Sequence, residues 1–172
     1  MKAIIPVAGV GTKLRPHTYT QPKALIPLAG KTVLSIIVDQ LKNAGITEFI
    51  FIIGYLGEKI QDYVEATYPY LNTHFVQQTD RQGIGHALKL TKEIVAGDEM
   101  FIVLGDTICE YNIEDVLKSE HSMLGLKKVD DPRDFGVAVL RPRADRGAFP
   151  FGSTWDRDRT RLRGGATALV DV

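Results

Sequence analysis

The stretch from Ala8 to Lys31 constrains the fold most, because it places a glycine-rich, cationic loop directly after a short apolar run. The apolar run, residues 2–7, predicts a first β-strand. Gly9 and Gly11 open the loop, and glycine lets backbone N–H groups approach an anion without a Cβ in the way. The loop carries four Lys or Arg residues and no Asp or Glu. Together these features predict a phosphate-binding site at the end of a strand.

Two common phosphate motifs fail on their spacing. The dinucleotide fingerprint G-x-G-x-x-G requires a third glycine where this chain has Leu14, and it requires a helix there, whereas Pro16 and Pro22 predict an extended segment. Gly30, Lys31 and Thr32 match the end of the Walker loop G-x-x-x-x-G-K-[ST], but the first glycine of that motif would fall at position 25, where this chain has leucine. Both motifs are therefore excluded.

The pattern that remains is G-x-G-T-[RK]-L-x-P-x-T, followed by P-K, a further proline and G-K. It is carried by Gly9, Gly11, Thr12, Lys13, Leu14, Pro16, Thr18, Pro22, Lys23, Pro27, Gly30 and Lys31. This pattern resembles the signature of the sugar nucleotidyltransferases, which make nucleoside-diphosphate sugars from a sugar 1-phosphate and a nucleoside triphosphate. The resemblance covers residues 1–140 and implies the nucleotide-binding domain of a Rossmann-like fold. Family enzymes continue well beyond this length, with an E-K-P segment that this chain lacks, so we expect a truncated member.

Apolar periodicity predicts alternating strands and helices. The expected strands are residues 2–7, 48–53, 73–78, 100–104, 122–126 and 135–140, and the expected helices are 33–43, 57–68, 84–95 and 113–119. Thr32 is the predicted N-cap of the helix at 33–43. The alternation indicates an α/β fold with a mostly parallel sheet and helices on both faces. Ligands of such sheets bind beyond the carboxyl ends of the strands, where the glycine loop lies.

Three later segments fall at the same strand ends. Asp106, after the strand at 100–104, is the expected Mg²⁺ ligand, and the alternative is a carboxylate that caps a turn. In the sugar nucleotidyltransferases that the chain resembles, a segment matched here by Gln78 and Gly83 lines the nucleobase pocket. The alternative interpretation of these two residues is an ordinary glycine turn. The resemblance likewise implies a sugar contact at Gly136, with a glycine bulge as the equal alternative.

The resemblance assigns further roles within the loop. Lys13 and Lys23 are the expected catalytic residues, Lys13 on the pyrophosphate side and Lys23 at the α-phosphate and the incoming sugar phosphate. Most members have Arg where this chain has Lys13, and Lys cannot form the bidentate fork of Arg. The nucleotide-binding residues are expected to be Ala8, Gly9, Gly11, Thr12, Gln78 and Gly83.

Composition narrows the class of protein. The 172 residues carry zero formal net charge, which argues against nucleic-acid and polybasic membrane partners. No apolar run approaches the length of a membrane span, and Cys109 is the only cysteine, so we expect a cytoplasmic protein. A homo-oligomer is left open.

Residues 141–172 differ in composition from the rest. The first 140 residues hold eleven Lys and three Arg, whereas the last 32 hold seven Arg and no Lys. This change predicts a domain boundary after Leu140. The Arg-rich tail is interpreted as a shifted reading frame or a cloning-derived sequence, with a genuine Arg-rich extension as the alternative.

The leading functional hypothesis is transfer of a nucleotidyl group, with dTTP or UTP favoured, to a sugar 1-phosphate with release of pyrophosphate and with Mg²⁺ as cofactor. Two alternatives stay open. One is a catalytically incomplete nucleotide-binding or regulatory module. The other is a nucleotidyltransferase for a non-sugar phosphate, such as a molybdopterin or polyol phosphate.

Overall fold

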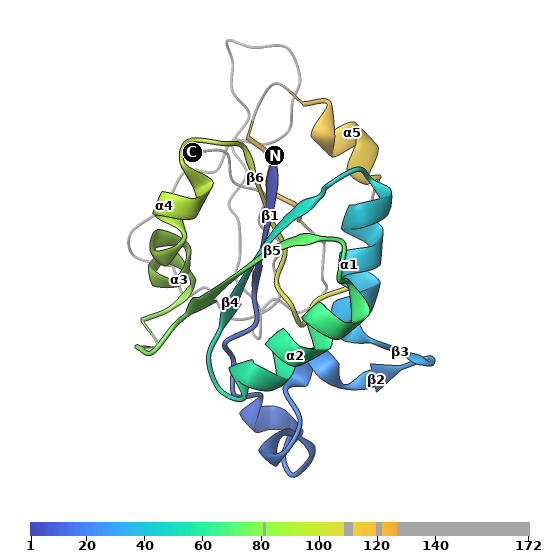
Figure 1. Ribbon diagram of the computed structural model, residues 1–172, viewed down its shortest axis with the longest axis vertical. Coiled ribbons are helices and arrows are strands. Elements are labelled where there is room, and N and C mark those ends of the chain that lie inside the picture. Colours follow the sequence, from blue (N-terminus) through green and yellow to red (C-terminus); the bar gives the residue numbers. More distant parts are fainter. Residues whose placement is uncertain (81, 109–111, 120–121, 127–172) are drawn as a thin grey trace. The chain divides into compact units, whose positions relative to one another are not determined.

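The structure, a computed structural model, describes residues 1–80, 82–108, 112–119 and 122–126. Within these residues four strands form a parallel sheet of order β5-β4-β1-β6 (Figure 1). The strands are β1 (Lys2–Pro6), β4 (Glu48–Ile53), β5 (Asn72–Gln77) and β6 (Met100–Ile102). The predicted α/β class with a parallel sheet is confirmed, and each predicted strand in this sheet is found within two residues of its expected ends.

Helices cover both faces of the sheet, as predicted (Figure 1). They are α1 (Val33–Asn43), α2 (Gly57–Thr67), α3 (Ile84–Leu90), α4 (Lys92–Val95) and α5 (Ile113–Leu117). Side chains of a strand point alternately to its two faces. Ile5 therefore packs in the core that contains α1, α2 and α5, whereas Ile4 packs in the core that contains α3 and α4.

The two central strands, β1 and β4, are the most buried part of the sheet. Ile5 pairs with Phe51 in the parallel register, and both side chains are fully buried. Burying an Ile or Phe side chain contributes about 1.5–3 kcal/mol. The loops that follow β1 and β4 therefore start from strand ends whose positions the core fixes.

The segment after β1 is not extended, contrary to the prediction made from Pro16 and Pro22. It forms three short 3-10 helices, η1 (Thr12–Leu14), η2 (His17–Tyr19) and η3 (Lys23–Leu25). The fixed φ of proline also suits the residue that opens such a turn. The carbonyl of Pro16 accepts from the N–H of Tyr19 at 3.0 Å, and that of Pro22 accepts from the N–H of Leu25 at 2.9 Å. We call residues 12–25 the arm. It leads into a short antiparallel hairpin of β2 (Pro27–Leu28) and β3 (Lys31–Thr32).

Two other elements differ from their predictions. The helix expected at 84–95 is divided at Thr91 into α3 and α4, because the Thr91 hydroxyl donates to the carbonyl of Leu88 at 2.8 Å and competes with the helical pattern. The strand expected at 122–126 is reduced to a single bridge residue, Leu124.

Several predictions concern residues outside the described ranges. These are the strand at 135–140, the sugar contact at Gly136, the boundary after Leu140 and the tail at 141–172. The described residues up to Leu124 belong to one compact unit. Among the described helices, none has the length and apolar character needed to cross a membrane.

Thr32 caps α1, as the sequence predicts. Its hydroxyl oxygen accepts from the N–H of Ser35 at 3.0 Å, and its own N–H donates to the Ser35 hydroxyl at 3.1 Å. We expect Thr32→Ala to lower the free energy of unfolding by about 1 kcal/mol, measured by urea denaturation, because the N–H of Ser35 loses its partner. Thr32→Ser restores the acceptor and should lose much less. Equal stability of the alanine variant and the wild type would show that the cap contributes nothing.

Candidate functional site

The carboxyl ends of β1, β4 and β6 are packed closely by two glycines. A Cβ placed on Gly54, after β4, would lie 2.8 Å from the Cβ of Ala8, and one placed on Gly105, after β6, would overlap the side chain of Val7. Ala8 is itself buried. Glycine at these positions lets the segments after three strands approach one another. The close approach at Gly54 was not predicted, because the sequence identifies this glycine only as the end of a strand.

The glycine turn after β1 holds the base of the arm. Gly11 has a φ of +64°, and its carbonyl accepts a hydrogen bond from the buried hydroxyl of Thr18 at 2.8 Å. A Cβ on Gly11 would lie 2.9 Å from Cγ2 of Thr18 and 3.2 Å from Cβ of Lys23. The turn therefore contacts both ends of the arm segment that runs from Thr18 to Lys23. Thr18 had no role in the prediction beyond its match to the motif.

Lys23 and Asp106 meet although they are 83 residues apart in the chain. Lys23 Nζ donates to Asp106 Oδ2 at 2.7 Å, and the Thr107 hydroxyl donates to Asp106 Oδ1 at 3.1 Å. The two side chains of the ion pair are 38% and 43% exposed. The structure thus brings together a residue predicted to bind phosphate and the residue predicted to bind metal, at an edge of the sheet that solvent reaches. Their roles in a reaction remain predictions.

Lys13 and Thr12 lie on η1 and are exposed. The Lys13 ammonium forms no hydrogen bond or ion pair with another described residue. Gly9, also exposed, has open space around the position of a Cβ. These residues face water as a phosphate site requires, and their proposed contact with nucleotide stays a prediction.

Gln78 and Gly83, predicted to line the nucleobase pocket, contact each other. The side-chain amide of Gln78 donates to the carbonyl of Gly83 at 3.3 Å and lies 3.4 Å from Nδ1 of His86. The backbone N–H of Gln78 donates to the carbonyl of Ile53 at 2.8 Å, which ties this segment to the end of β4. Gln78 is buried, so its amide is held in a defined orientation. The contact of His86 with Gln78 was not predicted.

Lys31, counted with the loop cations in the sequence, is paired elsewhere. Its Nζ donates to Asp39 Oδ2 at 2.7 Å, and the Tyr68 hydroxyl donates to Asp39 Oδ1 at 3.1 Å. Burial opposes ionisation of Asp39, but the hydrogen bonds from Lys31 and Tyr68 prevail and hold its pKa below the usual range. Lys31 therefore joins the β2–β3 hairpin to α1, and Lys23 is the loop lysine that reaches Asp106.

The donor set near Asp106 contains one carboxylate that could hold a metal. No cluster of three or more His, Cys, Asp or Glu side chains that suits a metal ion occurs within the described residues. Mg²⁺ is commonly held by one or two carboxylates, while phosphate oxygens and water supply its other ligands. The half-exposed carboxylate of Asp106 fits that mode of binding and does not fit a site built by protein ligands alone.

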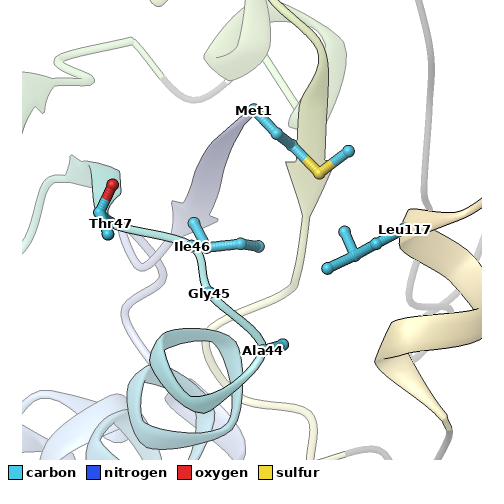
Figure 2. Close-up of a pocket in the computed structure, with 6 residues that line it drawn as sticks. All are labelled: Met1, Ala44, Gly45, Ile46, Thr47 and Leu117. Atoms are coloured by element: carbon cyan, nitrogen blue, oxygen red, sulfur yellow. The ribbon is translucent and has the colours of Figure 1, made fainter.

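A separate cavity of about 270 Å³ lies at the opposite edge of the sheet, where β1 and β4 begin (Figure 2). It is lined by Met1, Ala44, Gly45, Ile46, Thr47 and Leu117. None of these six residues has an ionisable side chain, so the cavity has no cationic or acidic side chains comparable to Lys23 and Asp106. The residues around Lys23 and Asp106 are therefore the candidate functional site.

Comparison with known proteins gives a consistent assignment. The nucleotidyl transferase family model matches residues 2–147. The bifunctional protein GlmU of Methanococcus vannielii is 40% identical over 141 residues, which cover 81% of this chain and 32% of that protein. The low-salt glycan biosynthesis nucleotidyltransferase Agl11 of Haloferax volcanii is 36% identical over 145 residues, which cover 80% of this chain and 41% of that protein.

A crystal structure provisionally assigned as a glucose-1-phosphate thymidylyltransferase from Bacillus anthracis, in complex with a sucrose, matches with a TM-score of 0.74 and 30% identity. The match covers 83% of this chain and 61% of that one. The chain thus spans about a third of the length of GlmU and about two fifths of the length of Agl11.

Gly11 offers a test of the geometry at this site. We expect Gly11→Ala to lower the free energy of unfolding by about 1–2 kcal/mol, because alanine is disfavoured at positive φ and its Cβ meets Thr18 and Lys23. The matched control is Gly9→Ala, which adds the same methyl group where space is open and should change stability by no more than about 0.5 kcal/mol. Equal losses in the two variants, measured by urea denaturation, would contradict the described turn.

Proposed function

This chain belongs to the nucleotidyl transferase family, and we propose that it transfers a nucleotidyl group from a nucleoside triphosphate to a sugar 1-phosphate. The observation that carries the proposal is the Lys23–Asp106 ion pair of 2.7 Å beside the glycine turn. It sets one cation for phosphate and one carboxylate for Mg²⁺ side by side, at the edge of a parallel sheet where ligands of such folds bind.

The proposed reaction forms one bond and breaks one. An oxygen of the sugar 1-phosphate attacks the α-phosphorus, and the bond from that phosphorus to the oxygen that bridges to the β-phosphate breaks. Pyrophosphate leaves with the electron pair. Such a transfer depends on alignment and charge neutralisation more than on a covalent nucleophile.

Each lysine has a distinct part in this proposal. Lys23 holds the α-phosphate and the incoming sugar phosphate, so that the two anions approach in spite of their repulsion. Lys13, exposed on η1, neutralises the charge that builds up on departing pyrophosphate. The backbone N–H groups at Gly11 and Thr12 bind the triphosphate. Mg²⁺ held by Asp106 supplies further neutralisation of phosphate charge when it is bound.

Lys23 and Asp106 pair their opposite charges in the structure. In the proposed loaded state, phosphate replaces the Asp106 carboxylate as the partner of Lys23. The Asp106 carboxylate would then be available to hold the metal, and Lys23 would be available to hold phosphate. Because one ion pair would be exchanged for two new charge contacts, phosphate and metal would each favour the binding of the other.

We propose a pyrimidine triphosphate, dTTP or UTP, as the donor. The support is the resemblance of the Gln78 to Gly83 segment to the thymidylyl and uridylyl branches, and the buried amide of Gln78 beside Gly83 has the hydrogen-bonding groups to pair with a base edge. The thymidylyltransferase assigned to the Bacillus anthracis structure is consistent with this choice.

A second candidate is a nucleotide-binding module that is incomplete as a catalyst. It is favoured by the small donor set for a metal, since no cluster of three or more His, Cys, Asp or Glu side chains that could hold an ion occurs within the described residues. Such a module would bind triphosphate and Mg²⁺ but would release no pyrophosphate when sugar phosphates are added. An acceptor other than a sugar phosphate is the third possibility, and a panel of acceptors distinguishes it.

The test is a pyrophosphate-release assay with dTTP, UTP, ATP and GTP, each with Mg²⁺ and with a panel of sugar 1-phosphates. We expect turnover with a pyrimidine triphosphate, and we expect Lys23→Ala to reduce it about 100-fold or more, since loss of one preorganised electrostatic group has that effect. The matched control is Lys31→Ala, which breaks an ion pair of equal length at Asp39 and should retain most of the activity. Full turnover in Lys23→Ala would refute the proposed mechanism.

A further inference from the structure

We infer that Tyr55 and Lys59 are positioning residues that hold the arm in its active conformation, an inference that rests on the proposed function. Neither residue belongs to the glycine-loop motif, and neither touches Lys23 or Asp106 in a described contact. Tyr55 lies in the connection between β4 and α2, Lys59 lies in the first turn of α2, and both donate hydrogen bonds to the backbone of the arm.

The contacts are directed at the end of η2. The Tyr55 hydroxyl donates to the carbonyl of Tyr19 at 2.9 Å, and the Lys59 ammonium donates to the carbonyl of Thr20 at 2.7 Å. The last carbonyls of a helix have no partner within that helix. Within the arm, Tyr19 is held by its own N–H, which donates to the carbonyl of Pro16, and by Arg15, which stacks on its ring. The carbonyls of Tyr19 and Thr20 accept no described hydrogen bond from within the arm, and both residues are exposed. The two donors supply the missing partners from another element.

The donors come from a fixed part of the fold. The turn between β4 and α2 is tight, since the N–H of Gly57 donates to the carbonyl of Gly54 at 3.0 Å and a Cβ on Gly57 would lie 3.0 Å from Cβ of Ile53. Ile60, the residue after Lys59, is fully buried against the sheet. The arm is therefore tied to an anchor that the core holds in place.

A continuous path of contacts leads from this anchor to the site. Thr18 precedes the two anchored carbonyls, is 2% exposed and donates to the carbonyl of Gly11. Gly11 in turn contacts the base of Lys23. Release of Tyr19 and Thr20 would loosen Thr18, and with it the turn that binds phosphate. A ligand binds more weakly when a smaller fraction of the protein is in the conformation that binds it. We therefore expect weaker binding of triphosphate.

The test compares the wild-type chain with Tyr55→Phe, Lys59→Met and the double variant. Hydrogen–deuterium exchange of peptides that cover residues 12–22 reports the arm directly, and KM for triphosphate and kcat report its effect on the reaction. Each lost hydrogen bond should accelerate exchange of the arm roughly twofold to tenfold. We expect KM to rise by a similar factor while kcat changes less, because the loosened arm lowers the competent population.

Matched controls separate positioning from general destabilisation. Tyr70→Phe removes the hydroxyl of a tyrosine that is 98% exposed, and Lys89→Met removes an exposed lysine on α3, on the other face of the sheet. Neither control should alter exchange of the arm. Lys59→Arg retains a cationic donor and should restore KM and slow exchange.

Faster exchange confined to residues 12–22, with rescue by Lys59→Arg, supports the inference. Unchanged exchange of the arm in the double variant would overturn it, as would equal acceleration in peptides from β1 and β4. If the wild type releases no pyrophosphate with any substrate pair, the proposed function fails on its own. The exchange comparison still decides whether Tyr55 and Lys59 hold the arm.

Discussion

The account depends on the ion pair between Lys23 and Asp106, which connects the arm after β1 to the end of β6. An ion pair that is about 40% exposed contributes only about 0.2–1 kcal/mol, so it cannot hold these segments together. The buried strands do so instead. Ile5 and Phe51 pair at the centre of the sheet, and the glycines after β4 and β6 allow close approach beside Ala8. The ion pair forms because the core has already placed its partners at one edge of the sheet.

Because the buried strands supply the stability, the weak Lys23–Asp106 ion pair is available for the proposed function. A strongly stabilising pair of charges would resist exchange with ligands, whereas a pair open to water can be exchanged for phosphate and metal at little cost. The exposed arm has the same character. It is fixed at Thr18 by the hydrogen bond of a buried hydroxyl, and at Tyr19 and Thr20 by the side chains of Tyr55, before α2, and Lys59, in the first turn of α2. The rigid sheet and the lightly held arm together form a site that is preformed yet able to adjust.

Much of this fold follows from local sequence patterns. The strands at 48–53 and 100–102 are buried apolar runs, and Thr32 caps α1 because a hydroxyl directly precedes the helical pattern. The 3-10 turns of the arm were missed because the φ of proline suits an extended segment and the start of a turn equally well. The helix is divided at Thr91 because the Thr91 hydroxyl donates a hydrogen bond to the carbonyl of Leu88. The residue type alone does not predict that a threonine will form this bond.

The candidate site was predictable only in part, for a similar reason. The family motif and the position of Asp106 after a buried strand place Lys23 and Asp106 at the same edge of the sheet. Which loop lysine reaches the carboxylate depends on tertiary packing, and the structure pairs Lys31 with Asp39 instead. Tyr55 and Lys59 give no sequence signal because their acceptors are backbone carbonyls, which every residue carries.

The most direct test of the central claim is Mn²⁺ binding without nucleotide, measured by electron paramagnetic resonance, in the wild type and in Lys23→Met. If Lys23 competes with the metal for Asp106, its removal should tighten Mn²⁺ binding by up to about fivefold, since an exposed ion pair is worth up to about 1 kcal/mol. Asp106→Asn should abolish this Mn²⁺ binding, because it removes the carboxylate that holds the metal. Lys31→Met frees Asp39 instead of Asp106 and should leave the Mn²⁺ affinity unchanged. Equal affinity in Lys23→Met and the wild type, or Mn²⁺ binding that survives in Asp106→Asn, would contradict the account.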